Sequence, residues 1–229
     1  MKEINYEHWA KYIVEIASDH IKNEHPAVLE LASGNCKMAG FLSQKYPNLI
    51  ASDKSLLMLK WDYKNNLSKI CCDMTAIPFK AKFDLIISTF DSMNYLLNKR
   101  KLLTLFKEVK RVLKSNGVFT FDVSLENNSL EFDKSNLAEG TVNGYTFTRK
   151  SKYYPKLRIH KNVFEIMDKF GKVIREVHKQ KIYKFETYFD LIDKAGLYAV
   201  ECLDAFTFNN GSANSDRVQF ILMIDRNKC

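Results

Sequence analysis

The chain has 229 residues, of which 46% are hydrophobic and 27% charged, and its formal net charge is +8. This length and composition fit one large soluble α/β domain, or a domain with a substantial insertion. They exclude a membrane-spanning helix, because no apolar run approaches the roughly 20 residues that cross a bilayer. The N-terminal stretch MKEINYEHWAKY also lacks the apolar core of a secretion signal.

The cysteines indicate the redox environment. They are odd in number and scattered, and none forms the CxxC pairs of a zinc site. We therefore expect reduced thiols in a cytoplasmic protein, without a metal centre. These cysteines are Cys36, Cys71, Cys72, Cys202 and Cys229.

The first half of the chain alternates strand and helix patterns. Residues 82–89 are continuously apolar at their centre, as in a parallel strand covered on both faces. Residues 98–114 repeat leucine, phenylalanine and valine at helical spacing, and Asn116-Gly117 is expected to end that helix. The alternation predicts a doubly wound, Rossmann-like sheet. Its expected strands are 27–31, 48–53, 68–73, 82–89 and 118–123, and its helices are 6–22, 37–46, 55–61 and 98–114.

The pattern changes after residue 124. Residues 124–140 are polar and are expected to form a loop, and 141–184 predict antiparallel strands with a hairpin turn at 168–172. A helix at 186–195 and two strands, 198–206 and 217–225, complete the chain. The predicted fold is a seven-stranded, mostly parallel α/β sheet with an antiparallel last strand and an inserted antiparallel sheet. The predicted domains are 1–125 with 185–229, and the insertion 126–184.

The turn within AVLELASGNCKMAGFLSQK, residues 27–45, lies where an open parallel sheet binds ligands, beyond the C-terminal strand ends. Gly34 lets the backbone pass close to a ligand, and Asn35 tolerates a left-handed conformation. Asp53 lies 19 residues after Gly34, where a carboxylate can accept both ribose hydroxyls. Asp73 and residues 88–95 end the next two strands and belong to the same edge. The alternative is a purely structural role, in which the two aspartates only cap the helices that follow them.

These motifs together resemble the class I S-adenosylmethionine-dependent methyltransferases, over the length of the chain. The first motif of that family is an acidic residue followed by three alternate glycines; here Glu30 is the acid, and Ala32 and Cys36 replace the outer glycines. The donor carries no phosphate and needs no wide glycine-rich cradle. The other matching stretches are Asp53, Cys72-Asp73-Met74, FDLIIST, LLTLFKEVKRVLKSNGVFTFD and the C-terminal AGLYAVECLDAF with DRVQFILMID.

The resemblance implies a set of residues for S-adenosylmethionine and its product S-adenosylhomocysteine. Glu30 would orient the turn and the methionine end, Asp53 would bind the ribose, and Asp73 would accept the adenine amino group. Trp9 would belong to an aromatic lid, although a residue in such an apolar helix stripe is more often simply part of the core. The whole implied set is Trp9, Glu30, Ala32, Gly34, Asp53, Lys54, Met58, Asp73, Met74, Thr89, Phe90 and Tyr95.

The stretch FDSMNYLL, residues 90–97, resembles a branch that methylates small molecules, including the glycine, sarcosine and amino-sugar N-methyltransferases. The Asn/Asp-Pro-Pro-Tyr/Phe motif of nucleic-acid amino methyltransferases is absent, because residues 88–91 read Ser-Thr-Phe-Asp. The Pro-Cys motif of cytosine-C5 enzymes is absent as well. We expect methyl transfer to nitrogen, or less strongly to oxygen, of a small acceptor.

A protonated amine has no lone pair, so a nearby group must take its proton before in-line displacement. The candidates for this catalytic role are Asp91, Asp122 and His160. Each has a structural alternative: the aspartates can hold loops through backbone amides, and the histidine can simply be packed. An aromatic wall suits a cationic transition state, and its candidates are Tyr95, Tyr145, Tyr153 and Tyr154.

The positive charge is concentrated in one segment. Residues 145–184 contain 12 Lys and Arg against 3 Asp and Glu, which leaves the rest of the chain near neutrality. This segment is either a solvated sheet face or a surface for an acidic partner. The alternatives to a small-molecule enzyme are therefore an RNA methyltransferase and a non-catalytic interaction module of the same fold. The chain is expected to be a monomer or a homodimer.

Overall fold

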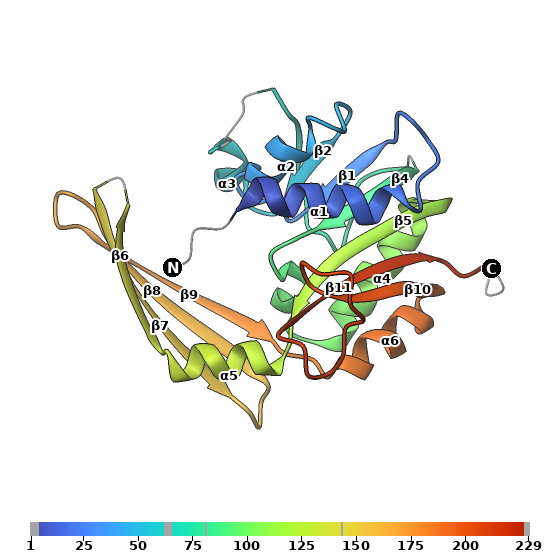
Figure 1. Cartoon of the computed structure of the whole chain (residues 1–229). Coiled ribbons are helices and arrows are strands. Elements are labelled where there is room, and N and C mark those ends of the chain that lie inside the picture. The colour runs from blue at the N-terminus through green and yellow to red at the C-terminus, as the bar shows by residue number, and fades with distance from the viewer. Residues whose placement is uncertain (1–4, 62–65, 81, 143, 227–229) are drawn as a thin grey trace.

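A computed structural model describes residues 5–61, 66–80, 82–142 and 144–226 (Figure 1). Cys229 lies outside the described residues. The first half contains α1 (Tyr6–Ser18), β1 (Val28–Leu31), α2 (Lys37–Leu42), β2 (Ile50–Asp53), α3 (Leu56–Lys60), β3 (Ser68–Cys71), β4 (Phe83–Ser88), the 3-10 helix η1 (Ser92–Tyr95), α4 (Lys99–Val112) and β5 (Leu113–Ser124). The second half contains α5 (Glu126–Lys134), β6 (Leu137–Val142), β7 (Tyr145–Tyr154), β8 (Ile159–Met167), β9 (Val173–Lys181), α6 (Phe185–Lys194), β10 (Leu197–Asp204) and β11 (Arg217–Ile224).

The described strands form two sheets. The larger has the order β10-β11-β5-β4-β1-β2-β3, in which β11 runs antiparallel to both of its neighbours and the remaining pairs are parallel. The smaller is the antiparallel sheet β6-β7-β8-β9. This arrangement confirms the predicted fold class, a Rossmann-like seven-stranded sheet with an inserted antiparallel sheet after its fifth strand.

Helices cover both faces of the larger sheet, and β4 shows why its sequence is apolar throughout. Ile86 points into one core cluster, with residues of α4 and α6, while Leu85 and Ile87 point into the other, with residues of α1 and α2. Successive side chains of a strand point to opposite faces, so a strand covered on both sides has no polar face. The site can therefore form only at the strand ends.

Two expectations about the chain between 113 and 140 are wrong. Asn116-Gly117 does not end the helix, because α4 passes directly into β5 and the dipeptide lies inside the strand. Gly117 is needed there for close approach: a Cβ would lie 2.8 Å from the carbonyl oxygen of Phe83. Residues 124–140 are not a loop but contain α5 and β6. The helix has a weak apolar stripe and depends on packing of Phe132 against Arg149 and His160 of the small sheet.

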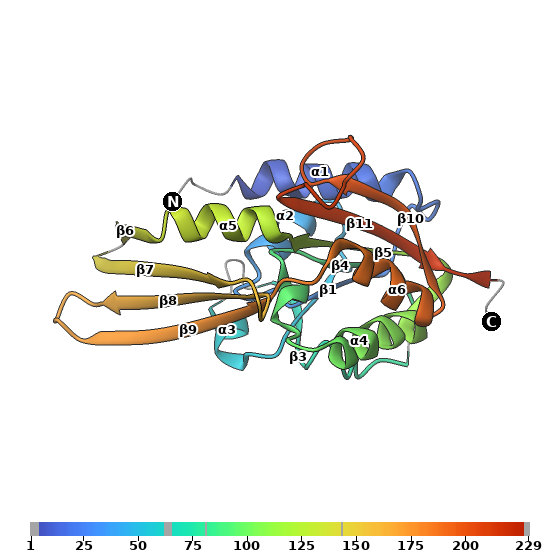
Figure 2. The ribbon, with the colours of Figure 1, turned by 90° about the horizontal axis from the view of Figure 1, so that it is seen from below.

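The small sheet projects beyond the large one, with α5 lying along it (Figures 1 and 2). Its register gives the two faces different characters. The inner face carries Gln180 and His178, whose side chains bond to Asp91 and Tyr95 at the end of the large sheet. The outer face places Lys152, Lys161 and Lys179 directly opposite one another across β7, β8 and β9.

Among the described residues, none of the helices has the length and apolar character needed to cross a bilayer.

Candidate active site

The turn between β1 and α2 has an unusual backbone. Ala32, Gly34 and Cys36 have φ values of 55°, 56° and 60°, so all three motif positions are left-handed. Glycine is the residue that adopts this region without a steric cost, whereas other residues lose about 1–2 kcal/mol. The turn is thus left-handed at three alternate positions, two of which are occupied by residues that bear a Cβ. Asn35, which could tolerate this conformation, does not adopt it.

Asp53, at the end of β2, joins the neighbouring turn to its own helix. Its Oδ2 accepts a hydrogen bond from the backbone N–H of Gly34 at 2.8 Å, and its Oδ1 accepts one from Ser55 N–H at 2.7 Å. Each carboxylate oxygen has two lone pairs, so each retains capacity for a ligand hydroxyl. Asp53 therefore has a structural task and still presents acceptors to the space above the turn.

Asp73 follows β3 and occupies the equivalent place one strand further along. Its Oδ1 accepts hydrogen bonds from the backbone N–H and the hydroxyl of Thr75, at 2.9 and 2.7 Å, and its Oδ2 accepts one from Lys54 Nζ at 3.0 Å. Partial burial raises the pKa of Asp73, but the bonds from Thr75 and Lys54 outweigh it and bring the pKa down to about 2. The group is a carboxylate at any physiological pH.

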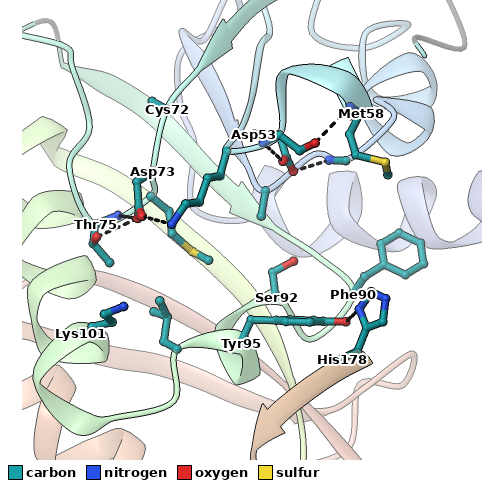
Figure 3. A pocket seen from close by; sticks show the side chains of 16 residues that line it. Asp53, Met58, Cys72, Asp73, Thr75, Phe90, Ser92, Tyr95, Lys101 and His178 are labelled. Carbon is teal, nitrogen blue, oxygen red and sulfur yellow. Dashed lines mark hydrogen bonds and ion pairs between the residues drawn. The ribbon is translucent and has the colours of Figure 1, made fainter. Parts of the chain in front are cut away.

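A cavity of about 650 Å³ opens between these two aspartates at the C-terminal edge of the sheet (Figure 3). One wall comes from the turn and α3, and the opposite wall comes from η1, α4 and β9. Its lining includes nine of the residues that the resemblance assigns to the cofactor, namely Ala32, Gly34, Asp53, Lys54, Met58, Asp73, Met74, Phe90 and Tyr95. No group of three or more potential metal ligands is assembled within the described parts of the chain.

The other predicted cofactor residues, Trp9, Glu30 and Thr89, do not line the cavity. Trp9 is 5% exposed and packs behind Phe90 with ring centroids 4.3 Å apart. Phe90 itself has φ 62°, a strained position that turns its ring toward the cavity. Thr89 is buried just before it.

Glu30 lies beneath the turn and is 1% exposed. Burial and, to a lesser extent, the negative charge of Asp53 raise its pKa, a hydrogen bond from the backbone of Ala39 opposes them, and the resulting pKa is about 8. Its Oε2 has no hydrogen-bond partner among the described residues. A carboxyl in this state is mostly protonated at neutral pH and acts as a neutral support under the turn.

The predicted proton acceptors Asp91 and Asp122 lie outside the cavity lining, in a buried cluster beside it. Arg217 at the start of β11 bonds to Asp122, and its Nη2 lies 3.3 Å from Asp91 Oδ1. Asp91 also donates its backbone N–H to Asp122 Oδ2 at 2.8 Å and accepts a bond from Gln180 at 2.7 Å. Burial raises the pKa of Asp122 to about 6, against the opposing effect of Arg217. Both carboxylates are thus engaged in holding three chain segments together.

His160, the third predicted proton acceptor, lies in β8 beneath α5 and is 4% exposed. Its ring contacts Phe132, and burial lowers its pKa. Of the four tyrosines predicted for an acceptor pocket, only Tyr95 lines the cavity. Tyr153 instead donates its hydroxyl proton to Glu126 at 2.7 Å.

Seven residues line the cavity without having been predicted for it: Ser55, Cys72, Thr75, Ser92, Leu96, Lys101 and His178. Ser55, Cys72 and Thr75 lie within two positions of Asp53 or Asp73, so proximity in sequence could have found them. His178 has no such signal. It reaches the cavity because β9 packs against η1, although the two elements are more than 80 residues apart in the sequence. The side chain of His178 bonds there to Tyr95.

Comparisons with known proteins agree with this geometry. Residues 28–117 match the family described as "Methyltransferase domain". The chain is 28% identical to YqeM of Bacillus subtilis (strain 168), whose name assigns it only provisionally to the methyltransferases, over 96% of this chain and 91% of that one.

Two solved structures show the same fold at low identity. An S-adenosylmethionine-dependent methyltransferase from Clostridium acetobutylicum ATCC 824 superimposes with a TM-score of 0.84 at 21% identity, covering 97% of this chain and 93% of the other. The sugar N-methyltransferase KedS8 from Streptoalloteichus sp. ATCC 53650 superimposes with a TM-score of 0.76 at 16% identity, covering 95% and 87%.

Residues 28–117 therefore match a methyltransferase domain, and the whole chain shares the fold of these two solved methyltransferase structures. The predicted resemblance is confirmed for the fold and for the domain that residues 28–117 match, while the methyl donor stays a prediction. The roles of individual residues stay predictions, because none of these comparisons tests them.

Proposed function

We propose that the protein transfers a methyl group from S-adenosylmethionine to a nitrogen atom of a small molecule. The observation that carries this proposal is that the ends of three neighbouring strands contribute to one cavity. Gly34 lies in the turn after β1, Asp53 ends β2 and Asp73 follows β3, and all three line this cavity. We assign residues 1–125 and 185–229 to donor binding and residues 126–184 to the acceptor side. The sugar N-methyltransferase KedS8, a solved structure with this fold, supports the choice of a small molecule as acceptor.

The residues present fit the donor by their chemistry. A Cβ on Gly34 would meet only Met58 Cε, at 3.5 Å, so its missing side chain leaves space on the cavity side of the turn. Asp53 offers acceptors to a ribose, and Met58 and Met74 offer apolar, polarizable surface to a purine. Glu30, which has a buried oxygen without a partner among the described residues, would support the turn rather than contact the donor. When bound, the donor supplies an electrophilic methyl group on a sulfonium.

The chain contributes to the reaction by positioning and by desolvation. Holding the acceptor in line with the methyl group is worth about 7–11 kcal/mol of the barrier. Phe90, backed by Trp9 and Tyr6 at ring distances of 4.3 and 5.3 Å, gives the cavity a rigid aromatic wall. Such a wall excludes water and suits the positive charge of the transferring group. Lys54 helps to keep Asp73 ionised, and Asp73 would offer its carboxylate to the adenine amino group.

The test is calorimetry with S-adenosylhomocysteine, followed by a transfer assay with methyl-labelled donor. The assay would offer matched pairs of acceptors, each an amino sugar or amino acid beside its hydroxyl counterpart. We expect binding of the product and transfer to members of the amino series. Absence of heat would instead favour the non-catalytic module, and transfer to hydroxyl compounds alone would refute the choice of nitrogen.

The RNA alternative has support from the outer face of the small sheet, which is the face opposite to that of His178. Lys152, Lys161 and Lys179 lie directly opposite one another, and like charges in such pairs destabilise a sheet. A polyanion such as RNA would relieve that repulsion. The RNA alternative predicts affinity that falls steeply between 50 and about 200 mM salt. Weak binding of single-stranded RNA that does not change with salt would remove it.

A further inference from the structure

One side of the cavity is formed by a strand of the small sheet. Glu176, His178 and Gln180 alternate along β9 and share its inner face, because the side-chain period of a strand is two. Gln180 bonds to Asp91, which places β9 beside η1. His178 is thereby brought to the cavity, where Figure 3 shows its ring beside Tyr95.

Three side chains form a continuous chain of hydrogen bonds at this position. The hydroxyl of Tyr95 lies 3.1 Å from His178 Nδ1, and His178 Nε2 lies 3.2 Å from Glu176 Oε2. A carboxylate at Nε2 favours the tautomer with its proton on that nitrogen, which leaves Nδ1 as the acceptor for the tyrosine proton. The ring is also held edge-on by Phe164, at a centroid distance of 5.2 Å.

These three hydrogen-bonded side chains give the cavity a proton acceptor, which the predicted proton acceptors do not. Asp91, Asp122 and His160 lie outside the cavity lining, whereas Tyr95 and His178 both belong to it. The side chain of His178 is 34% exposed, so a proton that reaches it can pass on to water. Burial raises the pKa of Tyr95 to about 12, so its hydroxyl keeps its proton and serves as a relay rather than as a permanent charge.

We propose that Tyr95, His178 and Glu176 form a proton relay that takes the proton from the nitrogen of the methyl acceptor. The inference rests on the proposed function and adds to it the side from which the acceptor arrives, between η1 and β9. Tyr95 is the catalytic residue of this relay, His178 takes up the proton through Tyr95, and Glu176 is a positioning residue that stabilises the imidazolium.

The step balances in atoms and electrons. The protonated acceptor nitrogen first gives its proton to the oxygen of Tyr95, whose own proton moves to Nδ1 of His178, and a lone pair is left on the nitrogen. That lone pair forms a bond to the methyl carbon as the carbon–sulfur bond breaks, and the electron pair of the broken bond stays on sulfur. The resulting imidazolium pairs with Glu176 and later releases a proton to water.

Other charged groups surround this relay. Asp91 lies four residues before Tyr95 along the chain and acts on it electrostatically. Lys101, Lys54, Asp53 and Asp73 line the same cavity. From the small sheet, Arg149 lies opposite Phe164, its partner in the β7–β8 register. The pKa of Glu30 is about 8 and that of Asp122 about 6, so both titrate in the range of a histidine.

The experiment compares two probes that differ only at the sulfonium centre. S-adenosylhomocysteine has a neutral sulfur there without the methyl group, and sinefungin has a carbon in place of the sulfur, with an ammonium where the methyl group would be. While His178 is neutral, Tyr95 donates its proton to Nδ1 and its oxygen can accept a hydrogen bond from that ammonium, whereas the positive charge of an imidazolium repels the ammonium. We expect the ratio of the sinefungin dissociation constant to that of S-adenosylhomocysteine to rise about threefold or more as the pH falls from 8 to 5.5.

The variant His178→Gln isolates the contribution of the imidazole, because Glu30 and Asp122 titrate equally in both proteins. The pH-dependent rise should be lost in this variant and kept in His20→Gln, whose histidine also bonds a glutamate, Glu201, but lies away from the cavity. Tyr95→Phe should reduce the rise as well.

A rise of equal size in wild type and His178→Gln, or a ratio independent of pH in the wild type, overturns the relay and leaves the proposed function intact. Failure of the wild type to bind either probe overturns the proposed function and the relay with it. Circular dichroism of each variant verifies that the comparison concerns folded protein.

Discussion

Asp53 Oδ2 and the backbone N–H of Gly34 are joined by a 2.8 Å hydrogen bond, so the end of β2 holds the turn that follows β1. The same carboxylate lines the cavity and accepts the N–H of Ser55. One side chain thus fixes the shape of the turn and presents oxygen atoms above it. This dual role makes its removal informative in two separate measurements.

We expect Asp53→Ala to weaken S-adenosylhomocysteine binding about tenfold or more, equal to about 1.4 kcal/mol. Because two backbone N–H groups also lose their acceptor, the free energy of unfolding should fall by about 1–2 kcal/mol. Calorimetry measures the first effect and urea denaturation the second. Asp190→Ala, at an exposed position of α6 outside the cavity, serves as the control. Unchanged affinity in the Asp53 variant would remove it from the ribose role.

Gly34→Ala separates the conformation of the turn from the space above it. At φ 56° the new Cβ costs about 1–2 kcal/mol of stability, a strain that the chain already tolerates at Ala32 and Cys36. The Cβ points toward the cavity, so affinity for S-adenosylhomocysteine should fall much more than stability. Gly171→Ala is the matched control, because Gly171 has φ 82° in the β8–β9 hairpin and a Cβ there would meet no atom within 4 Å. Equal affinity losses in both variants would contradict the role given to Gly34.

The part of the site that could be predicted from sequence is the part built along consecutive strands. Asp53 and Asp73 each follow a recognisable strand, and parallel strands end at the same sheet edge, so their convergence follows from topology alone. The left-handed geometry at Cys36 could not be predicted in this way. A cysteine there is disfavoured locally, and only the surrounding packing, in which its side chain is fully buried, holds it in place.

The contacts between the two sheets could not be predicted either. The register of β9 against η1 decides whether Asp91 faces the cavity or bonds to Gln180 instead. A single sequence contains no signal for that register. A one-residue shift of β9 would have turned His178 to the outer face. The same limit applies to α5, whose position depends on Phe132 packing against the small sheet.

Glu30→Gln tests the buried carboxyl beneath the turn. Its pKa is about 8 in the folded protein and near 4.3 in the unfolded chain, so the folded state binds the proton more tightly. The stability associated with that proton is complete below about pH 4. It is lost progressively as the pH rises to 8, by about 1.4 kcal/mol for each pH unit. The variant does not titrate there, so it should gain stability relative to the wild type on the order of 4 kcal/mol between pH 4.5 and 8.5. Urea denaturation at both pH values measures the gain, and a constant difference would show that the carboxyl does not titrate in this range.

Arg217→Met tests whether the ion cluster beside the cavity depends on its single guanidinium. Removing Arg217 leaves Asp122, which is 1% exposed, as a buried charge without its cation. Loss of one partner from a buried pair costs about 3–5 kcal/mol, and we expect that range at pH 8.

The cost should shrink at pH 5, because the pKa of Asp122 is already about 6 and rises further when the cation is gone, so the carboxyl takes up a proton. Adding Asp122→Asn to Arg217→Met should restore part of the stability at pH 8 and little at pH 5, since the amide removes the uncompensated charge and can still accept the N–H of Asp91. Denaturation of the single and double variants at the two pH values measures both effects. The same loss at pH 5 as at pH 8 would mean that Asp122 stays ionised without Arg217, and that another group balances its charge.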